Sequence, residues 1–211
     1  MTDFSLYLIT DRHQTDGRPL AEVVRRALEG GVRAVQLREK DLSAAALYRL
    51  AEELRHLTSE FGARLMINDR LDIARAVEAD GVHIGVSSVP VAVARQLLGK
   101  DMVIGYSAHT ISEALQAQAD GADFVTFGPV YATPSKIAYG APCGVKKLAD
   151  VAAALEIPVI GLGGISEVTI SEALTADMGG IAVISAVLAA SDPRAASASL
   201  LKKMEEYAHH S

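Results

Sequence analysis

The chain has 211 residues, of which half are apolar and 22% are charged, and its net charge is −6. This composition is typical of a globular protein with one large core, and it excludes a disordered chain. The acidic balance argues against a general nucleic-acid binder, because such proteins carry an excess of positive charge that neutralises phosphates. We therefore expect one domain over residues 1–211 with no nucleic-acid partner, and the sequence leaves a homo-oligomer open.

The cellular setting follows from two further features. No apolar stretch reaches the roughly 18 residues that a membrane-spanning helix needs, and the N-terminus lacks the basic region of a secretion signal. The single cysteine, Cys143, excludes an intramolecular disulfide bond and has no evident base partner nearby in the sequence. We expect a cytoplasmic protein without membrane contact and without a nucleophilic cysteine.

Short apolar runs alternate with helical patterns along the whole chain. The predicted strands are Leu6–Thr10, Ala34–Arg38, Arg64–Asn68, Gly81–Gly85, Met102–Tyr106, Phe124–Gly128, Val159–Leu162 and Gly180–Ile184. The helical pattern after the second strand is the clearest, because Ser43 can cap it, leucines recur every three or four residues, and Gly62 can end it. Eight strands alternating with helices predict the α/β class and a single (β/α)₈ TIM barrel, with a doubly wound open sheet as the alternative.

Reactive side chains in such a barrel gather at the carboxyl ends of the strands. Gln36, Arg38 and Lys40 stand at alternate positions after the second apolar run, so they share one face of the chain. An amide and two cations on one face suit a phosphate or diphosphate group. The alternative is a strand end that runs into solvated charges.

Asn68 and Asp69 close the third predicted strand. A carboxylate near a polyphosphate would bind Mg²⁺, which takes one or two protein oxygens and keeps several waters. Asp69 could also cap the helix that follows, and both roles could coexist.

Two histidines and a serine belong to the next two strand ends. His83 is more typical of a buried barrel histidine with satisfied hydrogen bonds than of a catalyst. His109 stands beside Ser107 at the start of a predicted helix, where it could transfer a proton or orient its neighbours.

The longest predicted loop, residues 129–144, contains Thr133, Ser135 and Lys136. Two hydroxyls and a cation beside a rigid proline could bind a second anionic group, and the length of the loop favours a lid over a plain connector. A surface turn is the alternative.

Glycines and a serine follow the last two strands. Gly163 and Gly164 come after the seventh strand, and Ile184 and Ser185 come at the end of the eighth. Barrels of this kind commonly bind phosphate at these loops through backbone N–H groups. A glycine-rich turn with a serine cap is the alternative.

Taken in order, these residues resemble the thiamine-phosphate synthase family over essentially the full length of the chain. The matching motifs are Tyr7-Leu8-Ile9-Thr10-Asp11, Gln36-Leu37-Arg38-Glu39-Lys40, Ile67-Asn68-Asp69-Arg70, Gly81-Val82-His83-Ile84-Gly85, Ser107-Ala108-His109, Gly128-Pro129-Val130-Tyr131, Thr133-Pro134-Ser135-Lys136, Gly163-Gly164-Ile165 and Ile184-Ser185. Each motif is short, but the ordered series is specific.

The resemblance implies a (β/α)₈ barrel and a Mg²⁺-dependent transferase of thiamine biosynthesis. Such enzymes join hydroxymethylpyrimidine diphosphate to thiazole phosphate, giving thiamine phosphate and diphosphate. Diphosphate leaves a stabilised pyrimidine-methyl cation, which the thiazole nitrogen captures. This step needs positioning and neutralised leaving-group charge more than a nucleophilic side chain.

The resemblance also implies roles for individual residues. It assigns Gln36, Arg38, Lys40, Asn68 and Lys136 to the pyrimidine diphosphate, Asp69 to Mg²⁺ and Ser107 to the pyrimidine. It assigns Thr133, Ser135, Gly164, Ile184 and Ser185 to the thiazole phosphate, next to Gly163. The candidate catalytic residues are Arg38, Lys40, Ser107, His109 and Lys136.

One segment departs from the family pattern. After Gly85 the synthases usually continue Gln-Glu/Asp-Asp, whose last residue is the second Mg²⁺ ligand, whereas this chain reads Val86-Ser87-Ser88. The related TenI proteins, thiazole tautomerases, share the barrel and lack parts of the diphosphate site, and there a residue matching His109 could be the acid/base. The retained Gln-x-Arg-x-Lys and Asn-Asp motifs favour the synthase. A non-catalytic protein that binds a phosphorylated ligand, or a regulatory one, is the third interpretation.

Overall fold

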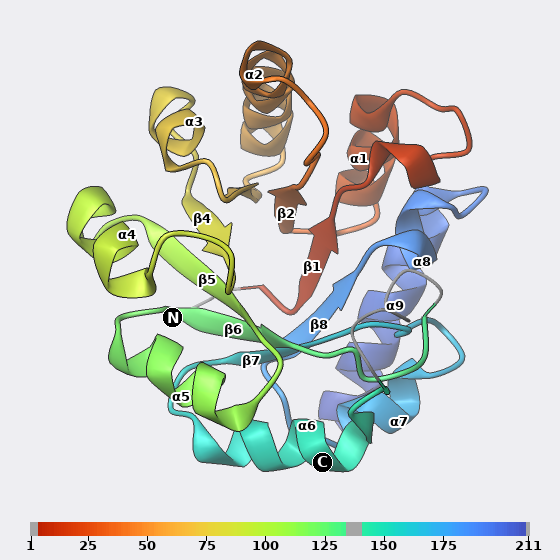
Figure 1. Cartoon of the computed structure of the whole chain (residues 1–211). Coiled ribbons are helices and arrows are strands. Elements are labelled where there is room, and N and C mark those ends of the chain that lie inside the picture. Colours follow the sequence, from red (N-terminus) through yellow and green to blue (C-terminus); the bar gives the residue numbers. More distant parts are fainter. Residues whose placement is uncertain (1–3, 134–140, 210–211) are drawn as a thin grey trace.

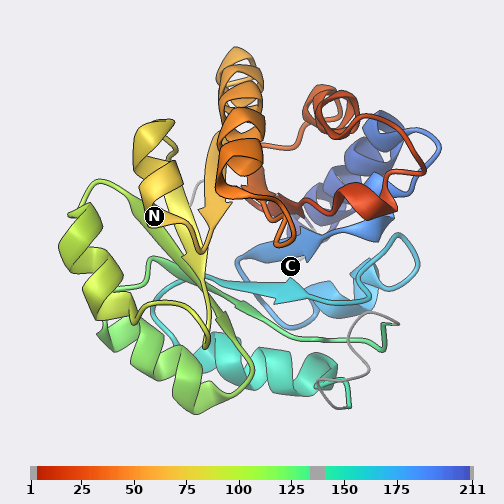
Figure 2. The same ribbon diagram turned by 45° about the horizontal axis from the view of Figure 1, so that its top comes forward.

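Eight parallel strands close into one ring in the computed structural model, which describes residues 4–133 and 141–209 (Figures 1 and 2). The strands are β1 (Leu6–Ile9), β2 (Ala34–Leu37), β3 (Arg64–Asn68), β4 (Gly81–Ile84), β5 (Val103–Ala108), β6 (Phe124–Phe127), β7 (Val159–Leu162) and β8 (Gly180–Val183). Each strand pairs with its neighbour in the sequence, and β8 pairs with β1. The predicted (β/α)₈ barrel is confirmed, and the open sheet is wrong.

Helices surround the ring and connect its strands (Figure 1). They are η1 (Arg12–Gln14), α1 (Leu20–Glu29), α2 (Ala44–Glu60), α3 (Leu71–Ala76), α4 (Val91–Leu98), α5 (Ile111–Ala119), α6 (Gly144–Ala154), α7 (Ile170–Leu174), α8 (Ser185–Leu188) and α9 (Pro193–Ala208). The last helix, α9, contacts α1, α7 and α8. No helix in the described ranges combines the length and the apolar character that crossing a bilayer demands.

Helix α2 has the ends that its sequence predicts. The Ser43 side chain accepts a hydrogen bond from the Ala46 backbone N–H, and Gly62 has φ 60° just beyond the last turn. Leu47 and Leu54 are buried on the side that faces the barrel. A polar cap, an apolar stripe and a glycine in the left-handed region therefore act together to define this helix.

The alternation along β2 decides which side chains face the barrel interior. Val35 and Leu37 belong to the core between strands and helices, whereas Ala34 belongs to the cluster inside the barrel. Gln36 lies on the same face as Ala34 and is 1% exposed. The strand ends one residue earlier than predicted, at Leu37, so the residues that follow belong to the loop at the barrel mouth.

Aromatic side chains fill the amino end of the barrel. The rings of Phe4 and Tyr7 both lie edge-on to Phe124, with centroids 5.6 Å apart in each pair. These three side chains are buried. Because this end is packed solid, the open space for a ligand lies at the carboxyl ends of the strands.

Candidate active site

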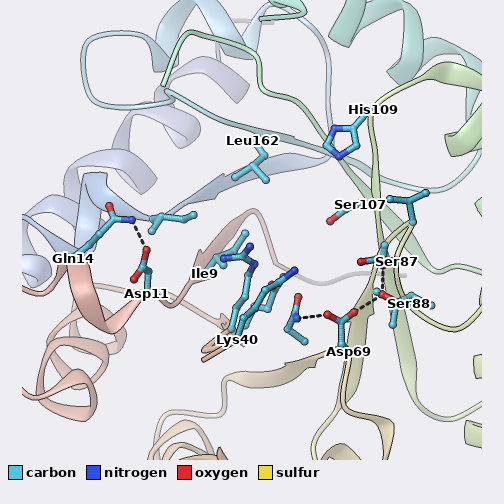
Figure 3. A pocket seen from close by; sticks show the side chains of 17 residues that line it. Ile9, Asp11, Gln14, Lys40, Asp69, Ser87, Ser88, Ser107, His109 and Leu162 are labelled. Carbon is cyan, nitrogen blue, oxygen red and sulfur yellow. Dashed lines mark hydrogen bonds between the residues drawn. The ribbon is translucent and has the colours of Figure 1, made fainter. Parts of the chain in front are cut away.

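A cavity of about 250 Å³ opens at the carboxyl ends of the strands. It is lined by Ile9, Asp11, Gln14, Gln36, Arg38, Lys40, Asn68, Asp69, Ile84, Gly85, Val86, Ser87, Ser88, Ser107, His109, Leu162 and Ile184. In Figure 3, Asp69, Ser88 and Ser107 lie on one side, Asp11 and Gln14 lie on the other, and Lys40 extends between them. Side chains from strand ends far apart in the sequence thus meet around one space.

Arg38 and Lys40 bring positive charge to this cavity. The backbone N–H of Arg38 donates to the Thr10 hydroxyl at 2.9 Å, which ties the loop after β2 to the end of β1. Within residues 4–133 and 141–209, neither cationic side chain has an ion pair or a hydrogen bond. Both cations therefore remain available to an anionic ligand.

The neighbouring carboxylates are held by another arginine. Arg12 bonds the buried Glu39 carboxylate at 3.1 Å and Asp41 at 2.5 Å. The Arg12 guanidinium holds the pKa of Asp41 well below its usual range. This arrangement joins η1 to the loop after β2 and keeps two acidic groups paired with Arg12 rather than with Arg38 or Lys40.

Gln36 lies at the floor of the cavity. Its amide nitrogen donates to the hydroxyl of Tyr7 at 3.0 Å. Burial raises the pKa of Tyr7 well above its usual range, so the hydroxyl stays protonated. The sequence predicts that Gln36 binds the ligand, whereas in the structure its amide nitrogen already has a partner within the protein.

Asp69 occupies an unusual backbone position beside Ser88. Its φ is 60°, in the left-handed region that Asp and Asn tolerate better than other residues with a side chain. Its carboxylate accepts from the Asn68 amide at 2.8 Å and from the Ser88 hydroxyl. The Ser88 oxygen in turn accepts from the Gly85 backbone N–H at 2.8 Å. Ser88 therefore orients the Asp69 carboxylate through a hydrogen bond and adds no second carboxylate beside it.

The alternative role of Asp69 as a helix cap is not observed. Helix α3 begins at Leu71, and no side chain caps its first turn. Within the described ranges no group of three or more His, Cys, Asp or Glu residues could hold a metal ion. The Asp69 carboxylate by itself still suits Mg²⁺, because this ion takes one or two protein carboxylates and completes its shell with phosphates and water.

His83 is a buried barrel histidine, as its sequence context predicts. It is 2% exposed, and burial lowers its pKa to about 3, so it is neutral at physiological pH. Its Nε2 lies 2.9 Å from the Ser107 hydroxyl. Ser107 itself belongs to β5, which runs two residues further than predicted because its pairing with β6 continues to Ala108.

His109 follows β5 and lines the same cavity. Its Nδ1 lies 2.9 Å from the Gly128 carbonyl oxygen, and a carbonyl only accepts, so Nδ1 carries the proton. Its backbone N–H donates to the Glu113 carboxylate at 2.8 Å, at the start of α5. The ring orientation is therefore fixed by the loop after β6.

A second cavity of about 540 Å³ adjoins the first. Gly163, Gly164, Ser185 and Thr133 line it. Both glycines have positive φ, 101° and 69°, and a Cβ on Gly164 would lie 2.6 Å from the Tyr131 Cβ. Glycine is therefore required at this wall. No side chain caps α8, so the alternative of a serine cap at its start is not observed.

Among the described residues, three line both cavities: Gln14, Leu162 and Ile184. Two predicted site residues, Ser135 and Lys136, lie outside the described residues. The structure adds Asp11 and Gln14, which the sequence analysis missed. The Gln14 amide donates to the Asp11 carboxylate at 2.6 Å. The signal for Asp11 was present, since it follows the end of the first strand and the same strand-end rule applies to it.

Known proteins resemble the chain along most of its length. The family model described as "Thiamine monophosphate synthase" matches residues 6–187. A Geobacter sulfurreducens protein named "Putative thiamine-phosphate synthase" is 59% identical over 199 residues, 94% of this chain and 93% of that protein. A thiamine-phosphate synthase of Moorella thermoacetica is 46% identical, covering 93% of each.

A solved structure agrees with these matches. The thiamine phosphate pyrophosphorylase from Pyrococcus furiosus superposes with a TM-score of 0.89, is 39% identical, and is covered over 96% of both chains. The family match extends from β1 to α8 and so includes every strand end that lines the two cavities. The chain belongs to the thiamine monophosphate synthase family.

Proposed function

We propose that this chain is a thiamine-phosphate synthase, which joins hydroxymethylpyrimidine diphosphate to thiazole phosphate and releases diphosphate. The observation that carries the proposal is a pair of cations, Arg38 and Lys40, without an ionic partner in the described ranges and in the same cavity as Asp69. The names of the relatives and of the similar structure support it.

In this proposal the first cavity takes the pyrimidine diphosphate. Arg38, Lys40 and Asn68 bind the diphosphate, and Ser107 lies beside the pyrimidine ring. The bond between the methyl carbon and the diphosphate oxygen breaks, and the two cations neutralise the negative charge that grows on the leaving group. The thiazole nitrogen then bonds to the methyl carbon. No side-chain nucleophile is required.

Asp69 would hold Mg²⁺, with Asn68 and Ser88 orienting its carboxylate. When bound, the ion supplies positive charge that offsets the charge of the leaving diphosphate. Because Ser88 contributes only a neutral oxygen, Asp69 is the one carboxylate on this wall, and substrate oxygens and water complete the shell. Binding of Mg²⁺ to the free protein is therefore weak and tightens when diphosphate is present.

The second cavity takes the thiazole phosphate in this proposal. Gly163, Gly164 and Ser185 offer backbone N–H groups and a hydroxyl, and Thr133 offers another hydroxyl. From the sequence pattern alone, Ser135 is proposed to complete this phosphate site, and Lys136 is proposed to bind the pyrimidine diphosphate. The shared wall of the two cavities supports the proposal, because the two substrates of one reaction must meet.

One experiment tests the function directly. Purified protein is given the pyrimidine diphosphate with thiazole phosphate, and separately the thiazole carboxylate phosphate that a tautomerase would isomerise. We expect thiamine phosphate to form, in a Mg²⁺-dependent reaction, and no isomerisation. Isomerisation without thiamine phosphate would establish the tautomerase instead, and binding without turnover would favour a non-catalytic protein.

The loss of turnover in His109→Asn distinguishes a synthase, in which His109 has a secondary role, from a tautomerase, in which it is the acid/base. The Asn amide can still donate to the Gly128 carbonyl, so we expect synthase turnover to fall by less than about tenfold. An acid/base role would instead cost about 10²–10⁴-fold. Steady-state kinetics of the variant measures the difference, and a loss above a hundredfold in thiamine phosphate formation would contradict the secondary role.

Ser88→Asp should increase Mg²⁺ affinity. The new carboxylate can keep the bond from the Gly85 N–H but stands beside Asp69, and the ion relieves the repulsion between the two charges. We expect Mg²⁺ to raise the Tm of this variant by several degrees more than that of the wild type, and turnover to saturate at lower Mg²⁺.

Ser88→Asn is the matched control for that variant, because it has the same shape without the charge. Thermal unfolding with and without Mg²⁺ gives a readout independent of turnover. Equal Mg²⁺ responses of Ser88→Asp and Ser88→Asn would contradict the assignment of the metal to Asp69.

We also propose that residues 1–211 form one domain of a cytoplasmic protein. Strands from Leu6 to Val183 belong to a single ring, which supports one domain. The lone Cys143 supports a reducing compartment.

A further inference from the structure

A row of polar side chains crosses the interior of the barrel beneath the first cavity. Gln36 bonds Tyr7 at 3.0 Å, the Tyr7 hydroxyl lies 3.4 Å from Nδ1 of His83, and Nε2 of His83 lies 2.9 Å from the Ser107 hydroxyl. Thr126 lies 3.4 Å from both Nε2 and the Ser107 oxygen. Four of these five side chains are buried, and Ser107 is half-buried. Ser107 and Gln36 line the cavity.

The direction of this row follows from counting donors and acceptors. Gln36 donates its amide N–H to the Tyr7 oxygen, so the Tyr7 proton must be donated elsewhere, and Nδ1 of His83 is the acceptor within reach. A neutral imidazole that accepts at Nδ1 carries its proton at Nε2. His83 then donates to Ser107.

Ser107 receives a second donor from the same side. The Thr126 hydroxyl donates to the Ser107 oxygen, so that oxygen accepts from two interior groups. The proton of Ser107 has no acceptor among these interior partners, and the open side of the residue is the cavity. Among the described residues, no buried side-chain nitrogen or oxygen lacks a hydrogen-bond partner, so every buried member of the row is satisfied.

We propose that Tyr7 and His83 are positioning residues that make Ser107 a hydrogen-bond donor toward the cavity, and therefore select a ligand with an acceptor atom there. A heteroaromatic ring with an unprotonated nitrogen has such an atom, whereas an amino group that needs an acceptor does not fit. This inference rests on the proposed function for the identity of the ring, but the donor order is a property of the free protein.

The opposite order is the physical alternative. If the Gln36 amide were turned by 180°, its oxygen would accept from Tyr7, Tyr7 would accept from Nδ1–H of His83, and Ser107 would donate inward to Nε2. Ser107 would then offer the cavity a lone pair instead of a proton. The two orders differ in the tautomer of His83, which can be measured.

The first experiment reads that tautomer in the ligand-free wild-type protein at neutral pH. Long-range ¹H–¹⁵N correlation of ¹⁵N-histidine-labelled protein distinguishes the two ring nitrogens, and the His83 signals are assigned by their loss in His83→Gln. We expect the proton on Nε2 and a bare Nδ1. A proton on Nδ1 would overturn the proposal, and so would equal populations of the two tautomers.

Gln36→Glu tests the origin of the order. A carboxylate accepts and does not donate, so Tyr7 should turn its proton toward residue 36 and the His83 proton should move to Nδ1. An unchanged tautomer in a folded, ionised variant would show that Gln36 does not set the direction, and would overturn this step.

The second experiment uses turnover and separates positioning from general damage. In His83→Gln the amide can still donate to Ser107, so we expect the KM for the pyrimidine substrate to stay within about threefold of wild type. In His83→Leu and Tyr7→Phe we expect that KM to rise about 3- to 10-fold while the KM for the thiazole substrate stays unchanged. Tyr48→Phe, which removes an exposed hydroxyl on α2, is the matched control.

The outcomes separate this inference from the proposed function. A wild-type protein with the Nε2–H tautomer but without thiamine phosphate synthesis would refute the function and keep the donor order. A wild-type protein that makes thiamine phosphate but has the Nδ1–H tautomer would keep the function and refute the donor order. Equal rises in both KM values for Tyr7→Phe would indicate a structural role only and would overturn the positioning assignment.

Discussion

Replacing Asp69 by Asn should lower thiamine phosphate synthesis by about 10²–10³-fold and remove most of its dependence on Mg²⁺. Asn keeps the size of the side chain and its ability to accept from the Ser88 hydroxyl, but it loses the negative charge that holds the ion. Without the ion, the charge on the leaving diphosphate is offset only by side-chain cations, which in the described ranges are Arg38 and Lys40. The loss should appear mainly in kcat at saturating pyrimidine substrate.

The measurement is turnover against Mg²⁺ concentration for wild type, Asp69→Asn and Asp150→Asn. Asp150 is an exposed carboxylate on α6, so its replacement controls for the change in net charge. Circular dichroism should give the same spectrum for the three proteins. Unchanged activity and unchanged Mg²⁺ dependence in Asp69→Asn would exclude metal-assisted departure of diphosphate for this chain.

Replacing Arg38 by Met should reduce kcat/KM for the pyrimidine substrate by about 10²–10³-fold, in line with the loss of a charge-assisted contact worth several kcal/mol. Met keeps much of the length of the side chain and removes the guanidinium. The backbone bond from residue 38 to Thr10 does not depend on the side chain, so the loop should stay in place. The KM for the thiazole substrate should change little, because Arg38 does not line the second cavity.

Arg49→Met is the control for that variant, since Arg49 is exposed on α2 and lines neither cavity. Isothermal titration with inorganic diphosphate measures the ligand contact without turnover. Equal affinities of wild type and Arg38→Met for diphosphate would contradict the assignment of Arg38 to the leaving group.

Local patterns were sufficient to predict the barrel and most of its mouth. A short apolar run marks each strand in the sequence. The handedness and spacing of βα units then bring the carboxyl ends of all the strands to one side of the barrel. Arg38, Asp69 and Ser107 therefore could be assigned to one cavity without knowing any contact between them. The strand ends were less predictable, because the pairing of β5 with β6 continues through Ser107 although the apolar run stops earlier.

Contacts across the barrel interior could not be predicted in the same way. Tyr7 lies on β1 and His83 on β4, strands that do not pair with each other, and only the closure of the ring brings the two side chains within reach. The bond between Ser88 and Asp69 is likewise unpredictable, because it depends on the left-handed backbone at Asp69. The sequence gives the type of each residue, but these hydrogen-bond partners depend on the closure of the ring and on local backbone conformation.

The shared wall of the two cavities has a consequence for the fate of the substrate. In the proposed reaction a carbon cation forms that water could capture as well as the thiazole nitrogen, which would waste a diphosphate ester and yield an alcohol. Leu162 and Ile184 line both cavities and offer no hydrogen bond from their side chains to a water molecule, whereas the amide of Gln14, which also lines both, donates to Asp11. The fraction of product that is alcohol thus measures how well this shared wall excludes water, and it links the yield of the reaction to the packing of side chains at the ends of β7 and β8.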